Sequence, residues 1–326
     1  VRVDEVARRS VPAVNPVSGS GRTRLALGLF IAAHLAGVAL EPVAAQDLEP
    51  RAFSPAPVGL NFAALGYAFS YGNVVLDPAL PITDGEADVH SLLGAYVRTI
   101  DFFGMSGKVD AAVPYVAYGK WTGLVEGVPD STTRSGFGDP LVRLSVNFIG
   151  APALKLPEFA QRKQGTVVGA SFQVRMPLGQ YDPTKIINLG TNRWTFKPRI
   201  GVSQPFGRWI VEGHGTAWFF TDNPDSFGNR ISQDPLWALD AHVARLFGTG
   251  IWASFDLGYI VGGRTESNGV PSTARQESLR GGATLALPLA RRHSIKLGYF
   301  FGLYTELGSD FDNLLVVYQY RWGGGI

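Results

Sequence analysis

Apolar and polar residues alternate strictly along residues 142–148 and again along residues 166–176. A period of two places successive side chains on opposite faces of a β-strand, so one face is apolar and the other polar. The pattern recurs about twelve times to the end of the chain, and no amphipathic helical pattern accompanies it to cover the apolar faces. Two folds remain: a large soluble sandwich, or a closed barrel whose apolar face meets lipid.

The composition favours the barrel that faces lipid. Charged residues make up 17% of the chain and aromatic residues 12%, whereas soluble domains carry about a quarter charged residues. A lipid-facing surface needs few charges and has aromatic girdles at its edges. The chain has no cysteine, which excludes disulfides, thiolate zinc sites and thiol catalysis. The formal net charge of +2 gives no indication of a nucleic-acid partner.

The beginning of the chain has the pattern of a secretory leader. Arg22 and Arg24 precede an apolar run over residues 25–40, and small residues follow at 43–45. We predict a signal peptide over residues 1–45 with a long N-terminal lead-in and cleavage after Ala45. The alternative is a membrane anchor, but the run is shorter than the roughly 20 residues that a spanning helix needs.

The predicted mature chain divides into three parts. Residues 46–58 are proline-rich and form either a flexible lead-in or a plug in the lumen. Residues 59–322 form the barrel, and residues 323–326 form a short C-terminal tail. The predicted fold class is an all-β, antiparallel, up-and-down transmembrane β-barrel of about twelve strands. We place these strands near residues 59–71, 88–102, 108–119, 138–149, 166–177, 192–203, 208–221, 234–247, 251–262, 275–287, 293–305 and 311–322.

The connections between these strands alternate in length. Odd-to-even connections, such as 72–87, 120–137 and 222–233, are mostly long and polar, whereas even-to-odd connections are mostly tight. Long loops on one rim and short turns on the other are typical of membrane barrels. Two connections break this rule, because 150–165 is long and 307–310 is short.

The alternation along each strand assigns a set of charged residues to the inner face. An Arg or Lys side chain in the middle of the lipid face would destabilise the barrel by about 2–4 kcal/mol. The set is weighted toward basic residues, which indicates either a positive lumen that favours anions or bases that pair with loop and plug carboxylates; both interpretations stay open. The candidate lumen-lining residues are Arg98, Arg143, Arg175, Arg193, Lys197, Arg199, Glu212, His214, Asp240, His242, Arg280 and Lys296.

His214 and His242 are predicted to lie inward on neighbouring strands, with Glu212 and Asp240 beside them. Histidines with carboxylates could form a metal site or a general base, but a structural network in the lumen is the favoured interpretation. No serine lies in a nucleophile elbow and no phosphate loop is present. We therefore predict no catalytic residue, no cofactor and no metal site.

Several stretches together resemble a known family. They are residues 54–61, 72–78, 136–140, 177–183, 188–194 and 262–265, with the sequences SPAPVGLN, GNVVLDP, GFGDP, PLGQYDP, NLGTNRW and GGRT. In combination they resemble the "MetA-pathway of phenol degradation" family over nearly all of the mature chain. The resemblance implies a Gram-negative outer-membrane barrel with a transport role, encoded near pathways that degrade aromatic compounds.

The predicted function is an outer-membrane channel for uptake of small hydrophobic or aromatic compounds such as phenol or benzoate. One alternative is a structural or adhesive barrel with a closed lumen, and another is a lipid-modifying enzyme in the barrel wall. The predicted partners are these solutes, the lipid and lipopolysaccharide of the outer membrane, and the barrel-insertion machinery. The last strand ends in an aromatic residue, Trp322, as the signal for that machinery usually does.

Overall fold

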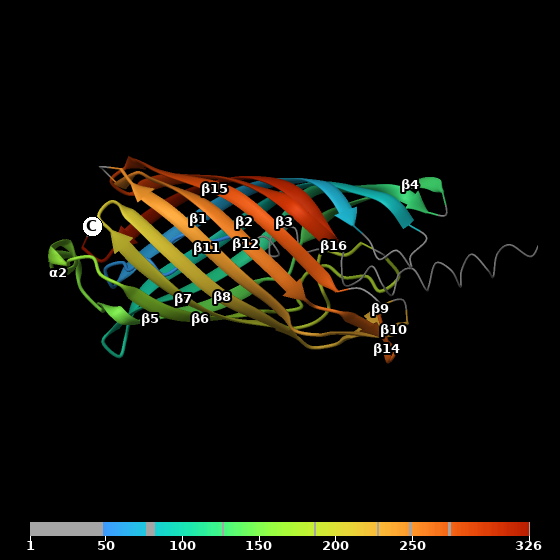
Figure 1. The fold of residues 1–326 in the computed structure, drawn as a ribbon, viewed down its shortest axis with the longest axis horizontal. Coiled ribbons are helices and arrows are strands. Elements are labelled where there is room, and N and C mark those ends of the chain that lie inside the picture. Colours follow the sequence, from blue (N-terminus) through green and yellow to red (C-terminus); the bar gives the residue numbers. More distant parts are fainter. Residues whose placement is uncertain are drawn as a thin grey trace, which may run out of the picture.

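The strands of the protein wrap into one long barrel (Figure 1). The computed structural model describes residues 48–75, 82–125, 127–185, 187–226, 228–247, 250–272 and 275–325. The predicted signal peptide and the first two residues of the proline-rich segment lie outside these ranges. Within them, no helix has the length and hydropathy needed to cross a membrane.

Twelve strand elements form one antiparallel sheet in the order β2-β1-β16-β15-β12-β11-β8-β7-β6-β5-β3-β4, and pairing of β2 with β3 closes it. The predicted closed antiparallel barrel is therefore confirmed. The elements are β1 (Leu60–Val75), β2 (Ile82–Phe102), β3 (Met105–Val125), β4 (Val128–Phe137), β5 (Leu141–Pro152), β6 (Val167–Arg175), β7 (Thr195–Phe206), β8 (Trp209–Phe220), β11 (Leu236–Leu246), β12 (Trp252–Gly262), β15 (Gln276–Ala290) and β16 (His293–Gly323).

Two elements of this sheet differ from the predicted strands. Residues 293–307 of β16 pair with β15, and residues 308–323 pair with β1, so β16 contains two successive wall strands. The short 307–310 connection is the turn between them. Both β4 and β5 pair with β3, so together they act as one broken wall strand. Residues 120–137 are therefore a hairpin that extends the barrel, and their prediction as a loop is wrong.

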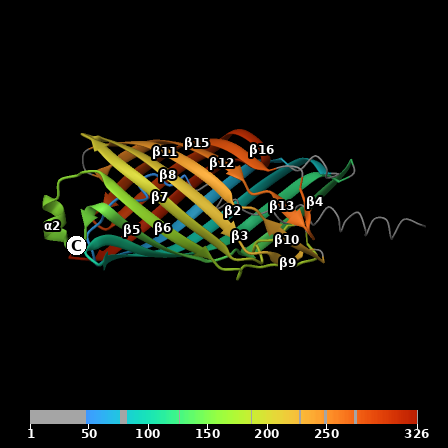
Figure 2. The same cartoon turned by 60° about the horizontal axis from the view of Figure 1, so that its bottom comes forward.

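The long connections gather at one end of the barrel, as predicted (Figures 1 and 2). There β9 (Asn223–Ser226), β10 (Asn229–Gln233), β13 (Thr265–Ser267) and β14 (Val270–Pro271) form a small sheet of four strands. The helix α2 (Leu156–Gln161) lies at the opposite end, within the unusually long 150–165 connection. The Lys155 backbone N–H donates to the Glu158 carboxylate at 3.0 Å and caps this helix.

Asp139 joins three of the stretches that carry the family resemblance. Its carboxylate accepts from the backbone N–H groups of Gly179 and Thr191, both at 2.8 Å, and from the Thr191 hydroxyl at 2.7 Å. Gly179 and Gly190 allow the chain segments to approach, because a Cβ on Gly190 would lie 2.8 Å from the Gly179 carbonyl carbon. These residues therefore shape the loops at the mouth of the barrel.

The two faces of the sheet differ in chemistry as the alternation predicts. The outer face exposes large apolar side chains, including Phe255, Leu257, Trp237 and Ile200, and no second layer of the described chain covers them. Charged and polar side chains fill the interior instead, and the buried ones include Asp110, Lys197 and Arg199. This distribution is that of an outer-membrane barrel and contradicts a soluble sandwich, whose core would be apolar.

Substitution Leu257→Arg places a charge at the middle of β12 on the outer face. We expect the free energy of unfolding to fall by about 2–4 kcal/mol, measured by urea titration in lipid vesicles. The matched control is Leu289→Arg, which lies beside the turn at one rim and is expected to cost at most about 1 kcal/mol. Equal costs for the two variants would contradict the assignment of this face to lipid.

Candidate functional site

The N-terminal segment, here residues 48–58, crosses the lumen of the barrel. Its side chains and backbone contact residues of β3, β5, β7, β8 and β12, which lie around the barrel wall. No regular helix or strand forms within it, and Pro50, Pro55 and Pro57 account for that irregular course. The candidate site is therefore the contact region between this segment and the charged side chains of the barrel wall.

Glu49 is the centre of the ion pairs between the segment and the wall. Its carboxylate lies 2.6 Å from Nη1 and 3.1 Å from Nη2 of Arg143, a bidentate pair. Arg199 approaches the same carboxylate at 3.2 Å. Burial raises the pKa of Glu49, but the positive charges of Arg143 and Arg199 outweigh burial and hold that pKa well below its usual 4.5. Glu49 is therefore an anion held by two wall guanidinium groups.

The backbone of the segment is bound by two further wall groups. Lys108 Nζ donates to the Ala52 carbonyl oxygen at 2.6 Å, and the Arg51 N–H donates to the Glu212 carboxylate at 2.5 Å. The Arg51 guanidinium also stacks over the Trp252 ring, 5.7 Å from its centroid. Charge-assisted hydrogen bonds of this kind are about twice as strong as neutral ones, so they fix the path of the segment.

Phe53 occupies a notch in the wall that glycine residues create. Its side chain is only 1% exposed. A Cβ on Gly169 would lie 2.4 Å from one carbon of the Phe53 ring, and a Cβ on Gly201 would lie 2.6 Å from another. The edge of the ring also meets His214, with centroids 5.4 Å apart. Any larger residue at position 169 or 201 would displace the aromatic ring.

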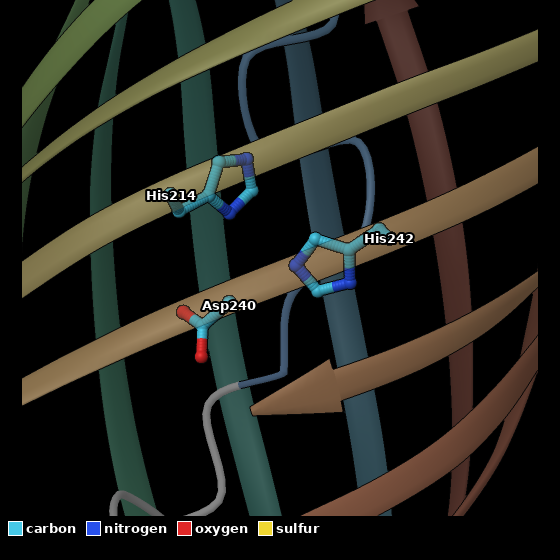
Figure 3. A group of neighbouring side chains, drawn as sticks. All are labelled: His214, Asp240 and His242. Atoms are coloured by element: carbon cyan, nitrogen blue, oxygen red, sulfur yellow. The ribbon is translucent and has the colours of Figure 1, made fainter. Parts of the chain in front are cut away.

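A cluster of His214, Asp240 and His242 lies beside this notch (Figure 3). His214 and Asp240 are register partners on β8 and β11, and the two imidazole centroids are 4.9 Å apart. His242 is completely buried, and its Nδ1 lies 2.8 Å from an oxygen of Asp256. One ligand atom from each member of the cluster lies within 4.8 Å of the others, so these three residues could hold a metal ion.

Three nitrogen atoms of the cluster have no hydrogen-bond partner within the described part of the chain. They are both ring nitrogens of His214 and Nε2 of His242. A buried polar atom without a partner costs about 1–3 kcal/mol. Serine catalysis is not supported at this position, because the Ser254 hydroxyl donates to Asp256 at 3.2 Å and is not bonded to an imidazole.

The structure buries nine of the twelve predicted lumen-lining residues. They are Arg175, Arg193, Lys197, Arg199, Glu212, His214, Asp240, His242 and Arg280. Arg143 is half-buried and contacts the segment, and the Lys296 ammonium lies 5.9 Å from the Trp252 centroid. Cation–π contacts place Arg193 over Phe220 and Lys197 over Trp218.

Arg98 differs from the other eleven residues, and its predicted inward position is wrong. It is exposed and donates to the Asn61 side chain at 3.4 Å, whereas its neighbours Val97 and Thr99 lie on the opposite face of β2, with Thr99 buried. Leu92 and Leu93 are adjacent apolar residues on this strand, so parity alone could not identify its inner face.

The sequence-based prediction does not include Glu49, Phe53 or the glycine notch among the functional residues. Glu49 and Arg143 are 94 positions apart and share no periodic pattern. A carboxylate and an aromatic residue within the proline-rich segment were visible, but their partners depend on closure of the barrel. Gly169 and Gly201, which face each other across β6 and β7 in register, were the available signal.

Comparison with known proteins gives one family and several solved barrels. The family model described as "Putative MetA-pathway of phenol degradation" matches residues 68–306, well over half of the chain. An outer membrane channel from Pseudomonas putida F1 has a TM-score of 0.72 and 18% identity, covering 84% of this chain and 99% of that one. It shares the fold.

Two more distant barrels are also similar. The beta domain of the Bordetella autotransporter BrkA has a TM-score of 0.45 and 13% identity, covering 81% of this chain and 100% of that one. KdgM porin has a TM-score of 0.40 and 10% identity, covering 79% of this chain and 98% of that one. No curated protein matches the sequence.

Substitution Gly169→Ala tests the notch. The added Cβ would clash with the Phe53 ring, so we expect the N-terminal segment to detach and trypsin to cleave after Arg51 at least about tenfold faster, equivalent to about 1.4 kcal/mol. The control is Gly94→Ala, where a Cβ meets nothing within 4 Å. Unchanged protection of Arg51 in Gly169→Ala, measured by mass spectrometry, would contradict the notch.

Proposed function

The chain belongs to the "MetA-pathway of phenol degradation" family and has the fold of an outer-membrane barrel, and from these findings we propose that it is a channel for small aromatic solutes. Aromatic carboxylates such as benzoate are the favoured class, and neutral compounds such as phenol are the second. Passage is by diffusion past weak binding sites in the lumen, with no covalent chemistry and no cofactor.

The observation that carries this proposal is the basic cluster around Glu49. Arg143 and Arg199 bind its carboxylate directly, and the Lys108 ammonium binds the segment three residues away. Guanidinium groups bind carboxylates bidentately, whatever molecule carries them. The wall residues therefore offer a solute carboxylate the same contacts that they make with Glu49.

The N-terminal segment offers the wall both parts of an aromatic acid. Glu49 supplies the carboxylate and Phe53 supplies the ring, and each occupies its own position on the wall. We therefore propose that the segment is a plug and that an aromatic carboxylate competes with it for these positions. Release of the plug takes the Glu49 carboxylate away from Arg143 and Arg199, which favours entry of another anion.

The competing proposal is a structural role for a permanently closed barrel. The contacts between the plug and the wall support this role as well. The plug is held by ion pairs, backbone hydrogen bonds and a seated ring. The two proposals differ in one measurable property: a channel conducts when the plug contacts are weakened and recognises the solute, whereas a structural barrel stays sealed. Lipid hydrolysis is not proposed, because the described residues provide no serine bonded to a histidine base.

The double substitution Glu49→Gln with Phe53→Ala removes both anchors of the plug. We expect the open fraction in planar bilayers to rise at least about tenfold, which corresponds to about 1.4 kcal/mol, because the two substitutions remove the ion pairs of Glu49 and the seated ring of Phe53. Glu306→Gln, at an exposed carboxylate, is the control. A double variant that stays sealed would favour the structural barrel.

Benzoate is expected to open the wild-type channel and to carry current through it. Reversal potentials under a sodium benzoate gradient should show anion preference, and liposome swelling should be faster with benzoate than with benzylammonium of similar size. The reason is the positive potential of Arg143, Arg199 and Lys108 in the lumen. Clear cation preference would end the proposal for carboxylates while leaving phenol uptake open to the swelling assay.

The pH dependence of the plug follows from the lowered pKa of Glu49. A lowered carboxyl pKa means that the ion pairs are complete at neutral pH and are lost only as the pH falls through that lowered value. We expect wild-type conductance to stay low from neutral pH down to the usual carboxyl pKa of 4.5 and to rise below it. Opening already near neutral pH, recorded in planar bilayers, would show that Glu49 does not hold the plug.

A further inference from the structure

We propose that His214, His242 and Asp240 form a binding site for one divalent transition-metal ion of the Zn²⁺ class in the lumen wall. Two imidazoles and one carboxylate are a ligand set that zinc uses when its fourth position stays open. This inference goes beyond the proposed channel and does not depend on which solute the channel carries.

The geometry brings the three side chains together from two neighbouring strands. Asp240 and His214 are direct register partners, and His242 lies two residues further along β11, on the same face. Figure 3 shows the three side chains gathered on one patch of the inner wall. Ligand atoms of one zinc ion lie about 3–4 Å apart. The present spread of at most 4.8 Å therefore closes with side-chain movements of about 1 Å.

The hydrogen bonds of His242 leave the correct nitrogen available. Its Nδ1 is engaged by Asp256 at 2.8 Å, and the Asp256 carboxylate also accepts from Ser254 and Thr284, both at 3.2 Å. A histidine that binds metal typically donates its other ring N–H to a carboxylate in this way, which fixes the tautomer. The free Nε2 of His242 is thereby presented as a metal ligand.

His214 is the second unpartnered member of the set. Its side chain is 3% exposed, and neither ring nitrogen has a partner among the described residues. In a purely structural network these nitrogens would be hydrogen-bonded, because buried polar groups nearly always are. A metal ion would satisfy one nitrogen of His214 and Nε2 of His242 at once.

The surrounding charges are compatible with a bound cation. Glu212 is buried on β8, is the register partner of His242, and has one carboxylate oxygen without a partner among the described residues. The wall guanidinium of Arg199 donates to Thr216 at 3.0 Å and is paired with Glu49. Carboxylates therefore offset the positive charge near the cluster.

Metal binding to the tag-free full-length mature protein in detergent tests the site, after treatment with a chelator. Zinc chloride titration by calorimetry is expected to show one ion per chain, and His214→Ala and His242→Ala should each weaken binding at least about 100-fold, beyond the 10–100-fold typical of outer partners. The matched controls are His90→Gln and His293→Gln, whose histidines contact Tyr67 and Tyr318. Equal affinity in all four variants, or no binding by the wild type, would overturn the proposal.

Copper(II) provides a readout that does not depend on whether the variants fold. The electron paramagnetic resonance spectrum of the wild type loaded with one equivalent should show coupling to two imidazole nitrogens, and a spectrum without them would overturn the site. Asp256→Asn should weaken zinc binding about 10–100-fold while keeping the copper spectrum, as expected for a positioning residue. If Asp256→Asn binds zinc with wild-type affinity and keeps the copper spectrum, Asp256 does not position His242 for metal binding.

Discussion

A lipid bilayer offers backbone amides no hydrogen-bond partner, and this constraint determines the rest of the structure. A sheet in the membrane must close on itself, because an open edge would leave a row of unpaired N–H and C=O groups in hydrocarbon. Pairing of β2 with β3 satisfies that requirement. Closure also separates the two faces of every strand, so that the apolar outer side chains meet lipid and the charged side chains of the inner face need partners in the interior.

The N-terminal segment supplies part of the partners that the inner charged side chains need. A barrel of this strand number is wide enough to hold wall side chains and one further chain segment. Arg143 has Asp110 as a wall partner and Glu49 as a partner from the N-terminal segment. The segment therefore acts as a counterion as well as a filler. The exchange proposed above would replace the Glu49 carboxylate with that of a solute at the same two guanidinium groups.

The wall was predictable from sequence, and the interior was predictable only in part. Alternation along residues 142–148 identifies a strand and its faces because the period is strict there, whereas Leu92 and Leu93 on β2 gave no such signal and Arg98 was misplaced. The polar composition of residues 120–137 predicts a loop, although cross-strand pairing such as Trp121 with Thr132 continues through them. Polar strands that extend beyond the membrane lack the apolar face on which the prediction depends.

The notch and the histidine cluster are parts of one piece of wall, and this explains why Gly201 matters to both. A Cβ at that position would lie 2.4 Å from His214 and 2.6 Å from the Phe53 ring, so the absent side chain makes room for the two rings together. The ring of Phe53 then rests against His214. A metal ion bound to His214, as proposed above, would affect the seating of Phe53 by the same factor by which that seating affects metal affinity, because coupling between two binding equilibria is reciprocal. His214 is therefore the wall side chain through which the N-terminal segment and the histidine cluster are in contact.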